Sequence, residues 1–140
     1  PVGVGGKGNS GVAGVIKNTQ GAIGYLNYGY VNGGKFQQVA LQNRAGNFVK
    51  ANSETSAAGL AKIVLDDKLR GADPNPAGAN AYPIVSLTWI LAYPESAPGV
   101  KETLRYMLSE KSQGISDSLG YVPLPESLRQ KSLAAVDSIK

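Results

Sequence analysis

Apolar positions recur every three or four residues in several stretches of the chain, and longer apolar runs lie between those stretches. Side chains three and four residues apart share one face of a helix, so this spacing predicts amphipathic helices. The predicted helices cover about residues 10–19, 53–65, 98–111, 115–119 and 126–140. Asn9 or Ser10 is the expected N-cap of the first helix, and Ser53 with Glu54 is expected to cap the second.

Turn signals and shorter apolar runs predict the first strands. A β-hairpin is expected where residues 36–42 and 48–50 flank the polar turn at residues 43–47. The sequence Asn32-Gly33-Gly34 predicts another turn just before this hairpin. Residues 22–26 have the composition of a short buried strand.

The longest apolar run, YPIVSLTWILAY at residues 82–93, follows a Gly- and Pro-rich loop at residues 71–80. The run is rich in Ile, Val and Thr and lacks the alternation of a half-exposed strand, so it predicts a strand buried on both faces. Trp89 and three tyrosines could stack on a sugar or base, but because they lie inside apolar runs we expect them in the core; the tyrosines are Tyr25, Tyr28 and Tyr30. Helices that alternate with buried strands predict an α/β fold.

Composition removes most catalytic chemistry from consideration. The 140 residues can form one ordinary domain, and 18 Gly with 8 Pro indicate many tight turns. The sequence contains no Cys and no His, which excludes disulfides, thiolate nucleophiles, imidazole metal ligands and Ser-His-Asp triads. The adjacent Asp66 and Asp67 are interpreted as a solvated helix end. We therefore predict no catalytic residue, no metal site and no cofactor.

Positive charge is concentrated in the first half of the chain. Residues 1–70 contain eight Lys and Arg against three Asp and Glu, whereas residues 71–140 contain six against seven. The first half should therefore attract anions, either through a solvated basic face or through a specific anion site. Nucleic acid is not an expected partner, because no run of basic residues is interleaved with aromatic residues.

One local motif, Gly5-Gly6-Lys7-Gly8-Asn9 ahead of a helix, has the parts of an oxyanion site. Backbone N–H groups, the positive end of a helix dipole and an ammonium group all favour a bound anion. The motif is not a P-loop, because glycine follows the lysine and no strand precedes it. Two interpretations stay open: a structural turn and cap, or a place for Lys7, Gly8 and Asn9 on the rim of a ligand cleft.

The chain has no stretch of about 18 apolar residues that would predict a membrane-spanning helix. Its first residue is Pro1, inside a Gly-rich run without the basic and apolar regions of a signal peptide. We expect such a start for a mature, trimmed or fragment end of a protein.

Three stretches resemble phosphate-binding proteins that serve ABC phosphate importers, and they occur in the same order as in that family. Residues 5–9 with residues 20–25 are similar to the family segment GGKGN…PGAIGY. Residues 82–93 resemble its (W/Y)PI…T…I strand, and LGYVPLP at residues 119–125 resembles the stretch before its last helix. Together these matches span nearly the whole chain.

The resemblance implies a periplasmic-binding-protein-like (type 2) two-lobed clamshell, of which this chain is only the C-terminal portion. Residues 1–85 would be part of the second lobe. Residues 86–140 would contain the hinge-crossing strand and the C-terminal helices that return to the first lobe, with the crossing within residues 82–90.

The resemblance also implies function, partners and location. The protein would capture inorganic phosphate in the periplasm, or at the cell surface as a lipoprotein, and deliver it to an ABC transporter permease. Contact with the membrane would be only through that transporter. The family's phosphate-gripping residues lie mostly upstream of the matched segment, and this sequence contains no Arg-x-x-x-Ser-Gly-Thr. The phosphate ligands in this chain are therefore unknown, and buried strands would need the missing N-terminal half as a partner.

Two other functions remain open. The chain could be a stand-alone small α/β module with a structural or interaction role and no ligand. An enzyme such as a phosphatase is the weakest alternative, because His and Cys are absent.

Overall fold

The chain folds into two compact units, Pro1–Gln38 and Val39–Lys140, in a computed structural model that describes residues 3–32 and 36–140. The predicted turn at Asn32-Gly33-Gly34 lies largely outside the described residues. Among the described helices, none combines the length and the apolar character needed to cross a membrane.

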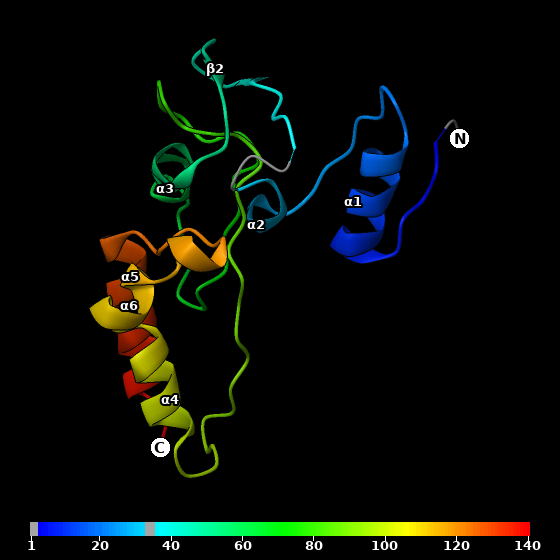
Figure 1. The fold of residues 1–140 in the computed structure, drawn as a ribbon. Helices are drawn as coiled ribbons and strands as arrows, with labels where there is room; N and C mark the ends of the chain where they lie inside the picture. Colours follow the sequence, from blue (N-terminus) through cyan, green and yellow to red (C-terminus); the bar gives the residue numbers. More distant parts are fainter. Residues whose placement is uncertain (1–2, 33–35) are drawn as a thin grey trace. The chain divides into compact units, whose positions relative to one another are not determined.

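The first unit contains two helices, α1 (Gly8–Asn18) and α2 (Tyr28–Val31) (Figure 1). α1 confirms the helix predicted at residues 10–19. The strand predicted at residues 22–26 is wrong, because the described residues of this unit form no strand and therefore supply no pairing neighbour. Ile23 and Tyr25 are instead largely exposed to solvent.

The second unit begins with the predicted hairpin, formed by β1 (Leu41–Gln42) and β2 (Phe48–Val49). The two strands pair antiparallel, with Leu41 opposite Val49. The strands are shorter than predicted, because pairing in residues 36–42 is confined to the two positions nearest the turn. Arg44 lies exposed in that turn, and Gly46 takes φ 87°, which favours glycine.

Buried Asn43 joins this hairpin to the Gly- and Pro-rich loop at residues 71–80. Its side-chain Nδ2 donates to the carbonyl oxygens of Gly78, Ala79 and Ala81 at 3.2, 2.8 and 3.1 Å. Its Oδ1 accepts from the backbone N–H groups of Ala45 and Asn47 at 3.1 and 3.0 Å. The side chain of Asn43 thus holds the hairpin turn and the loop together.

The helix α3 (Ser53–Leu60) starts with a capping box between Asn52 and Thr55, so the expected cap by Ser53 with Glu54 is wrong. Asn52 Oδ1 accepts from Thr55 N at 2.8 Å, and Thr55 Oγ1 accepts from Asn52 N at 3.1 Å. The helix ends five residues earlier than predicted, and Val64 beyond it is exposed.

The core of the second unit lies where α3 and the turn after it meet the C-terminal helix. Its buried members are Leu60, Ile63, Leu65 and Leu128. α3 packs closely on the following loop at Gly59, where an added Cβ would lie 2.7 Å from the carbonyl oxygen of Tyr82. Glycine at this position therefore allows close backbone contact.

The strand predicted at residues 82–93 is not formed among the described residues, whose single sheet is the β1–β2 hairpin. Val85 and Leu87 pack against the core, but the residues beyond them are exposed. Burial of Trp89, Tyr25 and Tyr30 was also wrongly predicted, because all three are exposed. Tyr28, predicted with them, is half-buried. Among the described residues no strand pairs with this apolar run, so the predicted α/β class is met only in part, and the regular structure of the unit is mostly helical.

Helices make up the C-terminal part of the second unit: α4 (Val100–Met107), α5 (Glu110–Gly114), the 3₁₀ turn η1 (Asp117–Leu119) and α6 (Glu126–Asp137). The helix predicted at residues 98–111 is divided because Ser109 caps α5 by accepting from Ser112 N at 3.2 Å. α4 and α6 lie side by side (Figure 1). Lys101 Nζ joins them by donating to the carbonyl oxygens of Asp137 and Ile139 at 2.8 and 2.6 Å.

Candidate functional site

The candidate residues Lys7, Gly8 and Asn9 lie together at the start of α1. Lys7 precedes the helix with extended backbone, and Gly8 takes φ 65°, a left-handed conformation that glycine adopts without strain. The first backbone hydrogen bond of the helix runs from Gly11 N to Lys7 O at 3.2 Å, and no side chain caps the helix. The N–H groups of the first turn therefore have no acceptor within the helix and carry its positive dipole end.

The glycines of this motif are required by close backbone packing. A Cβ added to Gly6 would collide with the backbone nitrogen of Val12. A Cβ added to Gly11 would lie 3.0 Å from the carbonyl carbon of Gly6. The segment before α1 is thus folded back against the first turn of the helix, which gives a structural reason for part of the motif.

Asn9 has a different role from the predicted N-cap. It lies inside α1, and its Oδ1 accepts a hydrogen bond from the backbone N–H of Asn27 at 2.9 Å. The side chain therefore ties the helix start to the segment before α2. Sequence reasoning missed this contact because the partner is 18 residues away.

The charge around this helix start is positive. Residues 1–38 contain Lys7, Lys17 and Lys35 and no Asp or Glu. Since no carboxylate in residues 1–38 opposes it, Lys7 and the helix dipole act in the same direction at the helix start and favour an anion. The close backbone packing gives the structural turn a physical basis, and a place for Lys7, Gly8 and Asn9 on the rim of a ligand cleft stays a prediction.

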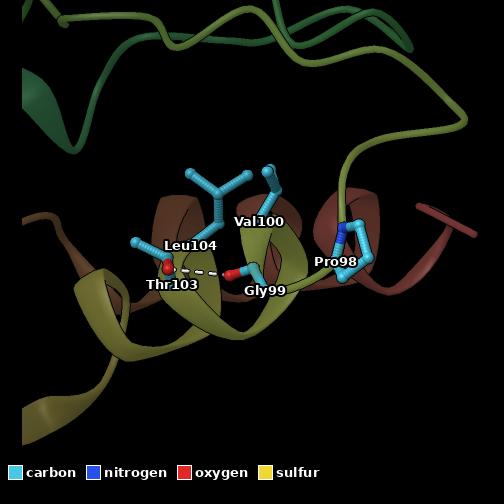
Figure 2. A pocket seen from close by; sticks show the side chains of 5 residues that line it. All are labelled: Pro98, Gly99, Val100, Thr103 and Leu104. Carbon is cyan, nitrogen blue, oxygen red and sulfur yellow. Dashed lines mark hydrogen bonds between the residues drawn. The ribbon is translucent and has the colours of Figure 1, made fainter.

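A shallow hollow of about 320 Å³ lies in the second unit at the start of α4. It is lined by Pro98, Gly99, Val100, Thr103 and Leu104 (Figure 2). The one side-chain hydroxyl among them, Thr103 Oγ1, donates to the Gly99 carbonyl oxygen at 2.7 Å. The hollow thus offers apolar surface and no cationic side chain to hold an anion.

No group of three or more carboxylate, His or Cys side chains suited to a metal ion occurs within residues 3–32 and 36–140. Asp66 and Asp67 do not form a paired acid. Asp66 instead accepts from Arg70 in an exposed turn beyond the end of α3, so the interpretation as a helix end is wrong, although both carboxylates are solvated as expected.

A comparison with protein families matches residues 2–111 to the PBP superfamily domain. The match covers well over half of the chain. The chain belongs to the PBP superfamily. This confirms the family resemblance and places the glycine-led helix start and the apolar run at residues 82–93 inside the matched region.

This PBP superfamily domain is similar to proteins named phosphate-binding protein PstS. It is 33% identical to the one from Methanocaldococcus jannaschii, over 99% of this chain and 40% of that protein. It is 35% identical to the one from Xylella fastidiosa, over 91% of this chain and 37% of that protein. The phosphate-binding protein PstS 3 of Mycobacterium tuberculosis is 27% identical, over 99% of this chain and 40% of that protein.

The domain spans about 40% of the length of the relatives it matches. The matched part is their C-terminal portion. The relatives are named for binding and not for a reaction, in agreement with a chain that lacks His and Cys.

The Asp66 carboxylate gives a pH test of the second unit of this domain. Its Oδ1 accepts from the backbone N–H groups of Arg70 and Lys68 at 2.8 and 2.9 Å, and its Oδ2 accepts from Arg70 Nε at 2.9 Å. These hydrogen bonds, first that of the Arg70 backbone N–H, lower the pKa of Asp66 below its ordinary 3.8. A lowered pKa means that the contact stabilises the fold above about pH 4 and is lost as the pH falls through the lowered value.

We expect an NMR titration of the Asp66 carboxyl to have its midpoint below 3.8. Arg70→Ala should raise this midpoint only part of the way, because the backbone N–H remains as a donor. Arg105→Ala is the matched control and should leave it unchanged, since Arg105 pairs with Asp137 instead. A midpoint at or above 3.8 in the unaltered chain would contradict the geometry.

Proposed function

We propose that the protein to which these residues belong captures inorganic phosphate as the substrate-binding component of an ABC importer. The observation that carries the proposal is the 33% identity to a phosphate-binding protein PstS over 99% of the chain, within a PBP superfamily domain. In this proposal the chain is the C-terminal portion of a two-lobed clamshell. The protein acts in the periplasm or as a cell-surface lipoprotein, without catalysis, and passes phosphate to the transporter permease.

The lobe boundaries are part of the same proposal. Residues 1–85 belong to the second lobe, and residues 86–140 cross the hinge and return to the first. The extended run at residues 85–93, which links the core around α3 to α4, suits a crossing segment because it belongs to no helix or hairpin.

Lys7, Gly8 and Asn9 contribute to the rim of the phosphate cleft and do not grip the ligand. Their support is the uncapped start of α1 and the positive charge of residues 1–38. Asn9 Oδ1 is already engaged by Asn27 N, so the rim acts through Lys7 and the helix dipole. In this proposal most of the groups that grip phosphate lie upstream of Pro1, as the family resemblance implies.

Calorimetry with inorganic phosphate tests this function. The isolated 140-residue chain should give no heat of binding, because the gripping groups are not in it. The same chain co-expressed with the polypeptide encoded upstream of Pro1 should bind phosphate with a dissociation constant of micromolar or below, since a closed cleft supplies dense charge-assisted hydrogen bonds. A complete protein that ignores phosphate would refute the proposal, and an isolated chain that binds it would refute the upstream location of the grip.

Lysine substitutions separate a rim from a gripping role in the complete protein. Lys7→Gln should weaken phosphate binding by about 3-fold or less, with the loss shrinking as salt is added, because it removes only a screened charge. Lys17→Gln, at the opposite end of α1, is the matched control and should have no effect. A loss of about 100-fold or more for Lys7→Gln would instead identify a direct ligand.

A further inference from the structure

The turn at residues 66–70 contains a leucine in a strained backbone conformation. Leu69 takes φ 59°, and the one other non-glycine residue with positive φ among the described residues is Ile84. A left-handed backbone costs free energy for a residue that carries a Cβ, so neighbouring contacts must hold it in place. The Leu69 side chain gives part of that support, because it packs against the apolar core of the second unit.

Asp66 supplies the rest of the support by closing this turn on both sides. Its backbone N–H donates to the Arg70 carbonyl oxygen at 2.9 Å, and its carbonyl oxygen accepts from Leu69 N at 3.0 Å. Its carboxylate Oδ1 accepts from the backbone N–H groups of Lys68 and Arg70 at 2.9 and 2.8 Å. The charged group paired with the carboxylate is the Arg70 guanidinium, whose Nη2 lies 2.8 Å from Oδ2. Asp67 and Lys68 are the other charged residues of this turn.

One peptide group joins the turn to Trp89. The Arg70 N–H that Asp66 Oδ1 accepts from and the Leu69 carbonyl oxygen belong to the same planar trans peptide, so they point in opposite directions. The Leu69 carbonyl oxygen accepts from Trp89 Nε1 at 2.7 Å. Among the described residues, this is the one hydrogen bond that joins residues 85–92, which contain no Asp, Glu, Lys or Arg, to another part of the chain. Carboxylate, peptide and indole thus form a continuous chain of hydrogen bonds in which each bond strengthens the next.

We propose that the turn at residues 66–70 is an acid-sensitive latch, in which ionised Asp66 fixes the peptide between Leu69 and Arg70 and the fixed peptide holds Trp89. Protonation removes the charge that makes the carboxylate a strong acceptor. The strained Leu69 then loses the support of the carboxylate, the peptide turns, and its carbonyl oxygen leaves the indole. Residues 88–93 are released from the turn, whereas Val85 and Leu87 stay packed against the core. The latch requires no phosphate, so its failure and that of the proposed function are separate results.

An NMR titration of the 140-residue chain follows the latch directly, because the chain contains one Trp and gives one indole N–H signal. Hydrogen bonds, first that of the Arg70 backbone N–H, lower the pKa of Asp66. The latch should therefore be closed at pH 6 and should open as the pH falls through a value below 3.8. The indole signal should move with the same midpoint as the Asp66 carboxyl, while the helix signal in circular dichroism stays constant. A loss of helix signal with that midpoint would overturn the latch, since acid would then be unfolding the whole unit.

Substitution of the two neighbouring carboxylates distinguishes the latch from a general effect of charge. Asp66→Ala should place the indole signal at its low-pH position already at pH 6. Asp67→Ala is the matched control, because the Asp67 side chain makes no hydrogen bond or ion pair among the described residues. This control should leave the indole titration unchanged, and the same response in both variants would overturn the latch.

Thermodynamic linkage gives a second test with a variant that keeps Asp66. Trp89→Phe retains an aromatic ring but removes the indole N–H, and the variant should fold because Trp89 is 46% exposed. Since the indole hydrogen bond favours the ionised carboxylate, its loss should raise the Asp66 midpoint by about 0.3 pH unit, which is about a 2-fold change in the acid dissociation constant. An unchanged Asp66 midpoint in Trp89→Phe, or an indole signal that does not follow the Asp66 titration, would show that the two groups are not coupled.

Discussion

Asn43→Ala is expected to lower the free energy of unfolding of the second unit by about 3 kcal/mol, because several hydrogen bonds of about 1 kcal/mol each are lost together. The Asn43 side chain is 5% exposed and serves three carbonyl oxygens of the loop and two N–H groups of the hairpin turn. Alanine leaves those groups without their partner in a place where water has little access. Chemical denaturation followed by circular dichroism measures the effect.

Two further variants show whether the stability of the second unit depends on the hydrogen bonds of the Asn43 side chain or on the conformation of the turn at residues 43–47. Asn47→Ala removes one exposed hydrogen bond to the Ala79 carbonyl oxygen and should cost about 1 kcal/mol or less. Asn43→Asp keeps the acceptor oxygen but places a carboxylate against three carbonyl oxygens, so it should destabilise at least as much as alanine. If Asn43→Ala and Asn47→Ala unfold at the same denaturant concentration, Asn43 does not hold the loop.

The Asn43 network shows which part of the fold the sequence could predict. The turn at residues 43–47 was predictable, because Asn and Gly favour turns through local backbone effects. The partners of Asn43 on the loop are 35 to 38 residues away, and no local pattern specifies them. Likewise the helices α1 and α6 were predictable from the spacing of their apolar residues. The division of the predicted helix at residues 98–111 into α4 and α5 was not, because it depends on the Ser109 side chain that caps α5.

The run at residues 82–93 is the most informative error. Its apolar composition predicts burial along its whole length, yet the described residues bury only part of it. Val85 and Leu87 find a core here, but Leu91 is 97% exposed. The hydrophobic pattern therefore predicted a buried strand, whereas among the described residues no strand pairs with this run.

The candidate site was predicted in position but not in detail. The sequence located Lys7, Gly8 and Asn9 at a helix start, since glycine followed by apolar spacing marks such a start. It could not predict that Asn9 would lie inside the helix and bind Asn27 N, because that outcome depends on the left-handed conformation of Gly8. The groups that grip a ligand could not be found at all, as the resemblance placed them upstream.

Arg129→Met is expected to lower the free energy of unfolding by about 2 kcal/mol, because a buried hydrogen-bonding network loses its donor. The Arg129 guanidinium donates to both carboxylate oxygens of Glu126 at 2.8 and 2.9 Å and to the Leu108 carbonyl oxygen at 3.2 Å. Its side chain is 11% exposed, whereas that of Glu126 is 65% exposed. Water screens the ion pair, so most of the loss comes from the Leu108 carbonyl and the packing of the guanidinium.

The position of Arg129 explains why lysine should not replace it. The planar guanidinium reaches from α6 to the C-terminal end of α4 and to Glu126 at the same time, and an ammonium group cannot donate in this fork geometry. Arg129→Lys should therefore recover less than half of the stability lost in Arg129→Met. Gln130→Ala, which removes one exposed hydrogen bond to Glu126, is the control and should cost less than about 1 kcal/mol.

The pH dependence distinguishes this network from simple packing. Hydrogen bonds from Gln130, and then from Arg129, lower the pKa of Glu126 below its ordinary 4.5. The contact of the ionised carboxylate therefore stabilises the fold above about pH 4.5 and is lost as the pH falls through the lowered value. The difference in stability between the unaltered chain and Arg129→Met should shrink over that range, as measured by thermal unfolding at pH 7 and at pH 3. A difference that does not change with pH would show that Arg129 acts through packing alone.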